Sequence, residues 1–254
     1  MEIAVCIKRV PDTAEADVRI DSSGRDIVRE RLAYTINEAD NYALEEALLW
    51  RERYGAGVTL VSFGSKEAEE VLRMGLAKGA TAAVRLDDAG MEGLDGLALA
   101  RVLAGFFSGR RFDVIMTGCV ATDDGNSQTG PALAALLGLP HATYVVRSEF
   151  SGDKVVVRRE LEGGLLEVKE IPLPCVLSFQ TGGNSPRYAS ILGIKRAAAR
   201  PIEQLPATRV GEQKTELVRL YLPEVVASAQ ILAGSLEEKT QVLAELLKTK
   251  GVVR

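Results

Sequence analysis

The sequence is poor in the residue types on which many catalytic and metal sites depend. Its 254 residues include one histidine, His141, and a lone histidine after a Leu-Pro pair is more often incidental than a catalytic base. The three cysteines, Cys6, Cys119 and Cys175, are odd in number, widely spaced and set among apolar residues. Such a set argues against a disulfide framework, a zinc site or a CxxC redox pair, so we expect buried, reduced thiols and no metal centre.

The sequence also lacks a basic excess and a long apolar run. A formal net charge of -4 provides no basic footprint for nucleic acid. No apolar run approaches the roughly 20 residues that a membrane span requires, and residues 1–9 are typical of a first strand rather than of a secretory signal. We therefore expect a cytoplasmic protein that binds no nucleic acid and spans no membrane.

What the sequence does contain is a regular alternation of two kinds of segment. Apolar runs rich in β-branched residues alternate with segments of helical spacing. The predicted strands are 3–7, 58–63, 84–86 and 112–117, and the predicted helices are 37–54, 66–78, 94–107 and 128–137. The alternation predicts an α/β fold: a parallel, Rossmann-like sheet with helices on both faces and its ligand at the carboxyl ends of the strands.

A polar turn after residue 117 is the strongest sign of a ligand site. Between Gly118 and Ala134 a buried strand ends, a glycine-bearing polar stretch follows and a helix begins. The backbone N–H groups of 127–130 and the hydroxyls of Ser127 and Thr129 would then point over the sheet edge, where a phosphate or pyrophosphate fits. Taken alone, such a stretch is more often an ordinary capped turn between a strand and a helix.

Three further segments would meet this turn at one rim of the sheet. They are 6–9, 37–40 and 62–64, and Asn37 with Asp40 resembles a capping box at a helix start. An adenosine could lie against such a rim. Because the sequence has neither G-x-G-x-x-G nor G-x-x-x-x-G-K-[ST], another nucleotide-binding topology would have to hold the phosphate.

The pattern changes after Pro140. Alternating apolar and charged residues predict a β-hairpin insertion at 144–171, with its charges on a solvated face, and 175–179 predicts one more buried strand. We assign residues 1–181, hairpin included, to an α/β nucleotide-binding domain. Residues 182–254 then form a recognition loop and an extended C-terminal arm that packs on a partner subunit.

Two parts of this arm have the composition of contact surfaces. An apolar group made of Ile191, Leu192 and Ile194 stands beside Lys195 and Arg196, which is the composition of a docking surface. From Ser235 onward, leucines recur at helical spacing in a polar background, so a terminal amphipathic helix is expected to need a partner face. The alternative without a partner is an arm that packs on its own domain.

In their order and spacing, six stretches make the chain resemble the β subunit of electron-transfer flavoproteins over nearly its whole length. They are Ile-Lys-Arg-Val-Pro-Asp-Thr with Val-Arg-Ile-Asp (7–13 and 18–21), Ile-Asn-Glu-Ala-Asp-Asn-Tyr-Ala-Leu-Glu-Glu-Ala-Leu (36–48), Leu-Arg-Met-Gly-Leu-Ala-Lys-Gly-Ala (72–80), residues 123–130 with their Gln-Thr-Gly ending, Arg-Glu-Leu-Glu-Gly-Gly (159–164) and Pro-Arg-Tyr-Ala-Ser (186–190). Each stretch is weak alone, and together they are specific.

The resemblance implies an electron-carrier subunit without acid–base chemistry of its own. It implies a heterodimer with an α subunit, a FAD shared with that subunit, and AMP in this chain. It further implies docking of acyl-CoA or other flavin dehydrogenases, with a membrane quinone oxidoreductase as a further partner. Carried over by position, the nucleotide contacts would be Cys6, Asn37, Asp40, Phe63, Asp123, Gly125, Asn126, Ser127, Gln128, Thr129 and Gly130. The partner-docking residues would be Tyr188, Ile191, Leu192, Ile194, Lys195 and Arg196.

Departures from the family pattern leave two questions open. Residues 123–130 match neither the AMP type nor the electron-bifurcating type well, although the Thr129-Gly130 ending favours AMP. The alternative is a bifurcating form with FAD in this cleft, which would oxidise NADH. Leu192-Gly193 stands where a Pro-Asn pair is frequent, so the partner dehydrogenase is open too. A second alternative, a stand-alone adenine-nucleotide-binding protein, gives residues 182–254 no role.

Overall fold

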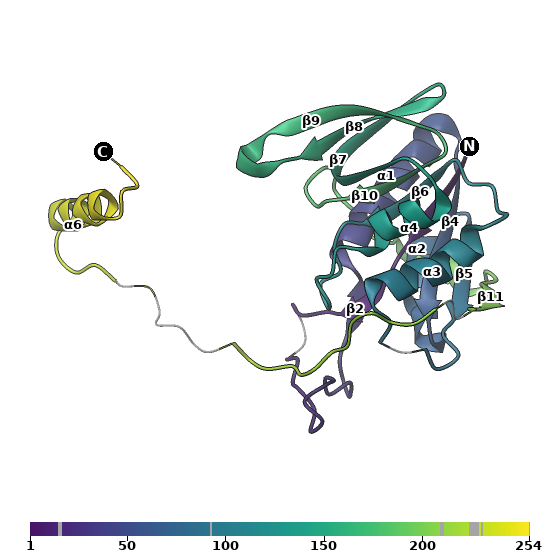
Figure 1. Ribbon diagram of the computed structural model, residues 1–254, viewed down its shortest axis with the longest axis horizontal. Helices are drawn as coiled ribbons and strands as arrows, with labels where there is room; N and C mark the ends of the chain where they lie inside the picture. The colour runs from purple at the N-terminus through teal and green to yellow at the C-terminus, as the bar shows by residue number, and fades with distance from the viewer. Residues whose placement is uncertain (15–16, 92, 209–210, 224–228, 230, 254) are drawn as a thin grey trace. The chain divides into compact units, whose positions relative to one another are not determined.

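The computed structural model describes residues 1–14, 17–91, 93–208, 211–223, 229 and 231–253. They fall into two compact units, Met1–Val218 and Arg219–Arg254, which are treated separately (Figure 1). The first unit therefore extends beyond the domain boundary predicted at residue 181. No helix among the described residues is both long enough and apolar enough to cross a membrane.

A nine-stranded sheet forms the centre of the first unit (Figure 1). Its order is β11-β5-β4-β1-β6-β10-β7-β8-β9, parallel from β11 through β7 and antiparallel beyond. The strands are β1 (Glu2–Cys6), β4 (Gly57–Gly64), β5 (Ala82–Asp87), β6 (Val114–Gly118), β7 (His141–Ser151), β8 (Lys154–Glu160), β9 (Leu166–Pro172), β10 (Cys175–Phe179) and β11 (Glu203–Pro206). The chain adds β4 and β5 on one side of β1 and then β6 on the other. Ligands of such sheets bind where the order reverses, here between β1 and β6.

Helices cover both faces of the sheet, as the alternation predicts. On one face lie α1 (Glu38–Tyr54) and α2 (Glu69–Lys78), the latter after a 3-10 turn, η1 (Lys66–Ala68). On the other lie α3 (Gly96–Phe107) and α4 (Thr129–Leu137). A hydrophobic core lies on each side of the sheet, and successive residues of β1 point into one and then the other. Ile3 and Val5 pack with α1 and α2, whereas Ala4 packs with α3 and α4. The predicted strands and helices are confirmed, with ends shifted by one or two residues.

The predicted β-hairpin insertion is instead a three-stranded antiparallel extension of the main sheet. β7 pairs with β10 in parallel and with β8 antiparallel, and β9 follows β8 after a 3-10 turn, η2 (Glu162–Gly164). Local alternation cannot reveal that β7 continues a sheet built by distant strands. His141 opens β7 and does not lie in a connection.

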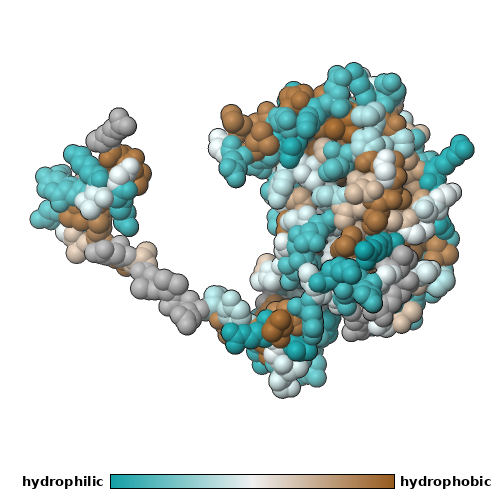
Figure 2. All heavy atoms as spheres, viewed as in Figure 1, coloured by the Kyte–Doolittle hydropathy of each residue, from teal (hydrophilic) through white to brown (hydrophobic). Residues whose placement is uncertain are grey.

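The two faces of this extension differ in their cover. One face packs on α1, where the rings of Trp50, Tyr54 and Phe150 form a cluster with centroids 5.6 to 6.2 Å apart. On the other face Leu166 and Val168 of β9 are 54% and 61% exposed. Figure 2 shows hydrophobic residues gathered at the η2 end of this extension. We call the face that carries Leu166 and Val168 the uncovered β9 face.

Residues that the sequence assigns to the arm belong in part to the sheet domain. α5 (Ile191–Ala198) packs on α2, and β11 joins β5 as a parallel edge strand. A small antiparallel pair, β2 (Arg9–Pro11) with β3 (Tyr34–Ile36), connects β1 to the start of α1. Helix α5 and strand β11 are therefore parts of the first unit.

The second unit contains the predicted amphipathic helix. α6 (Leu236–Thr249) begins with a complete capping box, in which Ser235 and Glu238 satisfy each other's backbone N–H groups. None of its residues is buried within this unit, and Leu236 and Leu243 are 76% and 50% exposed. Hydrophobic and hydrophilic residues lie side by side on its surface (Figure 2).

Candidate functional site

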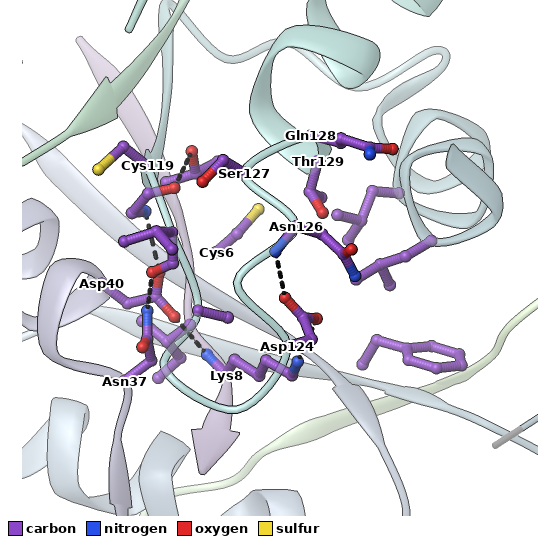
Figure 3. Close-up of a pocket in the computed structure, with 18 of the residues that line it drawn as sticks. Cys6, Lys8, Asn37, Asp40, Cys119, Asp124, Asn126, Ser127, Gln128 and Thr129 are labelled. Atoms are coloured by element: carbon purple, nitrogen blue, oxygen red, sulfur yellow. Dashed lines mark hydrogen bonds and ion pairs between the residues drawn. The ribbon is translucent and has the colours of Figure 1, made fainter. Parts of the chain in front are cut away.

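A pocket lies at the carboxyl ends of β1, β4 and β6, where the strand order reverses (Figure 3). It is the rim at which the sequence places segments 6–9, 37–40, 62–64 and 123–130. The predicted nucleotide contacts that the structure brings to the pocket wall are Cys6, Asn37, Asp40, Phe63, Asn126, Ser127, Gln128 and Thr129. In Figure 3, Asn37 and Asp40 lie on one side of the pocket, and Asp124 and Asn126 lie on the other.

The predicted contacts that lie outside the pocket wall are Asp123, Gly125 and Gly130. Gly125 has a φ of +63°, and its N–H donates to the Ala121 carbonyl at 2.8 Å, so it forms the turn rather than the wall. Gly130 lies where α4 touches β6 and β10. A Cβ there would overlap Ser178 Oγ and stand 2.9 Å from Thr117 Oγ1. Both glycines shape the loop from outside the pocket.

Asn37 joins the start of α1 to the loop after β6. Its Oδ1 accepts from the Thr122 N–H at 3.0 Å and its Nδ2 donates to the Val120 carbonyl at 2.9 Å. Asn37 makes no side-chain capping bond to α1, so the predicted capping box is wrong. The long-range bonds to the loop take both polar atoms of the side chain, which leaves none for the helix.

Asp40 holds two strand ends together from beneath the pocket. Its two oxygens accept from the backbone N–H groups of Lys8 at 2.8 Å and Gly118 at 2.9 Å. Burial raises the pKa of Asp40 to about 6, against the effect of these two donors. The approach is close enough to require a glycine at 118, because a Cβ there would stand 2.8 Å from the Ala39 Cβ and overlap the Asp40 carboxylate.

Lys8 is the one cationic side chain among the described residues that line the pocket. Its Nζ lies 2.7 Å from Asp123 Oδ1 and 2.9 Å from Asp124 Oδ2. Burial acts to lower the pKa of Lys8, but the two carboxylates outweigh it and raise that pKa above its usual value. Asp124 also accepts from the Asn126 N–H at 2.9 Å, which fixes the fold of the loop. The pair therefore holds loop 121–128 to the end of β1.

The start of α4 faces the pocket with its backbone donors uncapped. No side chain caps the helix at Gln128, and the Gln128 and Thr129 side chains line the wall beside it. Ser127 just before it has a φ of +51°, a left-handed conformation that is uncommon for a residue with a side chain. Backbone strain of this kind concentrates at functional sites. The loop thus presents N–H groups and two hydroxyls toward the cavity.

The thiols in the wall are not nucleophiles. Cys6 is half-buried, and burial together with the nearby Asp40 raises its pKa well above the usual range. Cys119 is buried, which raises its pKa to about 11, and it lies 3.3 Å from Gln180 Oε1. All three cysteines are free, as predicted, although Cys6 is less buried than expected. Both thiols in the wall stay protonated at neutral pH.

Several wall residues are missing from the predicted contacts. Lys8 follows the first strand directly, and its position in segment 6–9 is the signal that marks it. Leu99 and Leu103 of α3 also line the pocket. Their spacing of four residues is that of any core-facing helix, so the sequence gives no sign that they close a cavity.

The predicted docking residues form an exposed group at α5. Tyr188 is 97% exposed and Ile191 77% exposed, and Leu192, Ile194, Lys195 and Arg196 are exposed as well. What the sequence assigns to a loop is therefore a helix, begun by Ser190, whose Oγ accepts from the Gly193 N–H at 3.0 Å. We call these six residues the α5 patch.

The α5 patch stands on a fixed base. Arg73 of α2 donates to the carbonyls of Ala197 and Ala198 at 3.3 and 3.2 Å, which holds the last turn of α5. Gly193 lies against the backbone of α2, since a Cβ there would overlap the Ala77 carbonyl. The apolar side chains of the α5 patch are exposed although the helix that carries them is firmly held. Exposed apolar groups of this kind are typical of contact surfaces.

Arg187 fixes the chain just before the α5 patch. Its guanidinium makes three contacts of 2.8 to 3.1 Å with the carboxylate of Glu45 in α1, and its N–H donates to the same carboxylate at 2.9 Å. The third guanidinium nitrogen, Nη1, bonds to Glu52. The Glu45 side chain is 6% exposed, so the pair is largely buried.

The fold and pocket define a class: an α/β protein with a parallel sheet, a strand-end cavity at the switch point and an uncapped helix start above it. Comparison with known proteins agrees with that class and narrows it. Residues 25–210 match the family model of the electron transfer flavoprotein domain. This chain belongs to the electron transfer flavoprotein family.

Relatives of known name place the chain among the β subunits of that family. It is 35% identical to the electron transfer flavoprotein subunit beta of Methylophilus methylotrophus, covering 97% of this chain and 98% of that protein. It is 37% identical to the corresponding subunit of Thermoanaerobacterium thermosaccharolyticum over the full length of both chains. It is also 33% identical, again over both full lengths, to the caffeyl-CoA reductase-Etf complex subunit CarD of Acetobacterium woodii.

Proposed function

We propose that this chain is the β subunit of a heterodimeric electron-transfer flavoprotein and that its pocket holds an adenine nucleotide, AMP in preference to FAD. The observation that supports this most directly is the uncapped start of α4 beside the strained Ser127, facing a cavity at the switch point of the sheet. A phosphate satisfies unpaired N–H groups at a helix start.

The wall divides into an apolar and a polar part, which suits the two ends of a nucleotide. Cys6, Phe63, Leu99 and Leu103 supply apolar surface for a ring system. The N–H groups at the start of α4, with the Ser127 and Thr129 hydroxyls, supply donors for the phosphate. Asp40 and Asn37 contribute indirectly, because their hydrogen bonds keep the strand ends in place.

In this proposal the chain binds, orients and docks, and performs no proton transfer. AMP would supply no redox chemistry, whereas FAD in the same cleft would exchange electrons with NADH. Both wall thiols stay protonated, and Asp40 uses both oxygens to bind backbone N–H groups. Electrons would pass from a docked dehydrogenase to the FAD shared with the α subunit.

The partner surfaces required by this function are exposed. The uncovered β9 face and helix α6 both present leucines and valines to solvent, and each is a candidate contact for the α subunit. The α5 patch, with Lys195 and Arg196 beside its apolar side chains, would anchor a dehydrogenase that offers an apolar pocket with an acidic rim.

The bifurcating form is a second candidate, since one full-length relative is named as a subunit of a caffeyl-CoA reductase-Etf complex. The test is to express the chain with its α subunit, denature the purified complex and count the released nucleotides per heterodimer. One FAD and one AMP support the proposal. Two FAD without AMP support the bifurcating form. If no flavin and no stable complex are found, the electron-transfer function is overturned.

Hydrogen exchange at the start of α4 tests whether the nucleotide lies in this pocket. No side chain caps this helix start, so added AMP should slow deuterium exchange at its N–H groups several-fold, as followed by peptide mass. GMP serves as the matched control ligand. Equal exchange with and without AMP, in protein that releases AMP on denaturation, would place the nucleotide elsewhere.

A further inference from the structure

Asp95 makes an unusual set of hydrogen bonds for a helix-capping residue. One oxygen, Oδ1, caps α3 by accepting from the Ala98 N–H at 2.7 Å. The other, Oδ2, accepts from two backbone N–H groups far along the chain, Lys214 at 2.6 Å and Thr215 at 3.0 Å. These three bonds lower the pKa of Asp95 to about 2. A single carboxylate therefore joins a helix start to a segment about 120 residues later.

The segment that Asp95 holds is Gly211–Glu216, which we call the strap. All six of its residues are exposed, so burial of apolar surface contributes little to its position. Polar contacts hold it instead. Arg101 Nη1 donates to the Glu212 carbonyl at 3.1 Å, Gln213 bonds to the Gly93 carbonyl, and Arg25 lies 3.5 Å from Glu216.

Asp95 is the central contact of the strap. It is 9% exposed, whereas the Arg25 and Glu216 side chains are 61% and 80% exposed, and exposed ion pairs contribute little. It is also the only one of these contacts that binds two strap residues through a charge, and hydrogen bonds to an ionised acceptor are the stronger kind. Loss of this carboxylate should therefore release the strap while the sheet domain stays folded.

The strap is where the chain leaves the sheet domain. Among the described residues, the last backbone hydrogen bond before it joins the Ala207 N–H to the Asp87 carbonyl, and the second unit begins at Arg219, three residues after the strap ends. The second unit carries α6, whose apolar side chains have no cover of their own. The strap therefore fixes the chain to the sheet domain three residues before the second unit begins.

We propose that Asp95 is a positioning residue for subunit assembly: it fastens the strap to the start of α3 and so sets the point from which the second unit reaches the α subunit. The role in assembly rests on the proposed heterodimer, whereas the anchoring of the strap by Asp95 does not. A released strap must be ordered again on binding, and this cost weakens association.

The variant that tests this is Asp95→Ser. A serine Oγ still caps α3, as serine commonly does at this position, but cannot reach Lys214 and Thr215. Asp88→Ser is the matched control, because it makes the same change at a nearby carboxylate that accepts from the Gly90 N–H at 3.4 Å within its own loop. Arg101→Ala removes a different strap contact and should give an intermediate effect, which keeps the test usable if Asp95→Ser fails to fold.

The first measurement is trypsin cleavage after Lys214 in the isolated chain, followed by the mass of the products. A docked strap protects this bond, so Asp95→Ser should be cut about tenfold faster or more, and Asp88→Ser at the wild-type rate. Equal rates for Asp95→Ser and wild type overturn the anchoring role, whatever the partner is.

The second measurement is affinity for the flavin-loaded α subunit. Asp95→Ser should bind about threefold to tenfold more weakly, with Asp88→Ser unchanged. Faster cleavage with unchanged affinity overturns the assembly role while leaving the anchor in place. Failure of the wild-type chain to bind any α subunit is distinct from both of these outcomes, because it overturns the proposed heterodimer.

Discussion

Replacing Arg187 with alanine should destabilise the first unit by about 3 kcal/mol. The change leaves the Glu45 carboxylate 6% exposed and without the guanidinium that makes three of its contacts. Breaking a buried ion pair costs about 3–5 kcal/mol, and the 31% exposure of the Arg187 side chain puts the expected loss at the low end. In a unit of this size, that loss lowers Tm by about 6–12 °C.

A double-mutant cycle separates the pair from its surroundings. Urea unfolding of Arg187→Ala, Glu45→Ala and the double variant should give a coupling free energy of about 2 kcal/mol between the two side chains. The double variant is less destabilised than the sum of the single variants, because it leaves neither charge buried without a partner. Glu52→Ala is the matched control: Glu52 bonds to the same guanidinium, but its side chain is 55% exposed, so we expect a loss below about 0.5 kcal/mol. A coupling under about 0.5 kcal/mol, or equal losses from Glu45→Ala and Glu52→Ala, would refute the argument from burial.

Two further predictions concern Gly130, beside the pocket, and Asp40 in its wall. Gly130→Ala should cost about 1–3 kcal/mol because its Cβ would overlap Ser178, whereas Gly105→Ala, in a helix with open space around it, should gain about 0.5–1 kcal/mol; thermal unfolding of both variants checks this, and equal shifts contradict it. The Asp40 carboxyl has its pKa raised from 3.8 to about 6, so the folded state keeps a proton that the unfolded chain releases, and its contribution to stability is lost as pH rises through that range. The stability advantage of wild type over Asp40→Asn should accordingly shrink from pH 4 to pH 7 in urea unfolding; an advantage that stays level or grows with pH contradicts the raised pKa.

The parts of this molecule that could be predicted from sequence are those specified by short-range pattern. The apolar run of β1 predicts a strand buried on both sides, with Ile3 and Ala4 on opposite faces, and the helical spacing of apolar residues places each helix. The rim of the pocket also follows, because parallel strands bring their carboxyl ends to one edge whatever their order. Cys6 and Phe63 could be placed there by that rule alone.

What could not be predicted depends on contacts between distant residues. Asn37 has the local signature of a cap, yet its side chain bonds to Val120 and Thr122, more than 80 positions away. The strap has no periodicity at all, because it is held by hydrogen bonds with Asp95, which accepts, and Arg101, which donates, rather than by an apolar face. β11 is short and mostly exposed, so only its pairing with β5 identifies it as a strand.

The pairing of Lys8 with Asp123 and Asp124 also determines how ionic strength acts on the pocket. The only cation in the described wall is already paired with two carboxylates, so an incoming anion meets no unpaired cationic side chain there. Charge steering, which normally speeds the capture of phosphates and fades as salt screens it, is then absent. Any nucleotide held here would be selected by shape and by neutral N–H donors, and its affinity should change little between low and physiological salt.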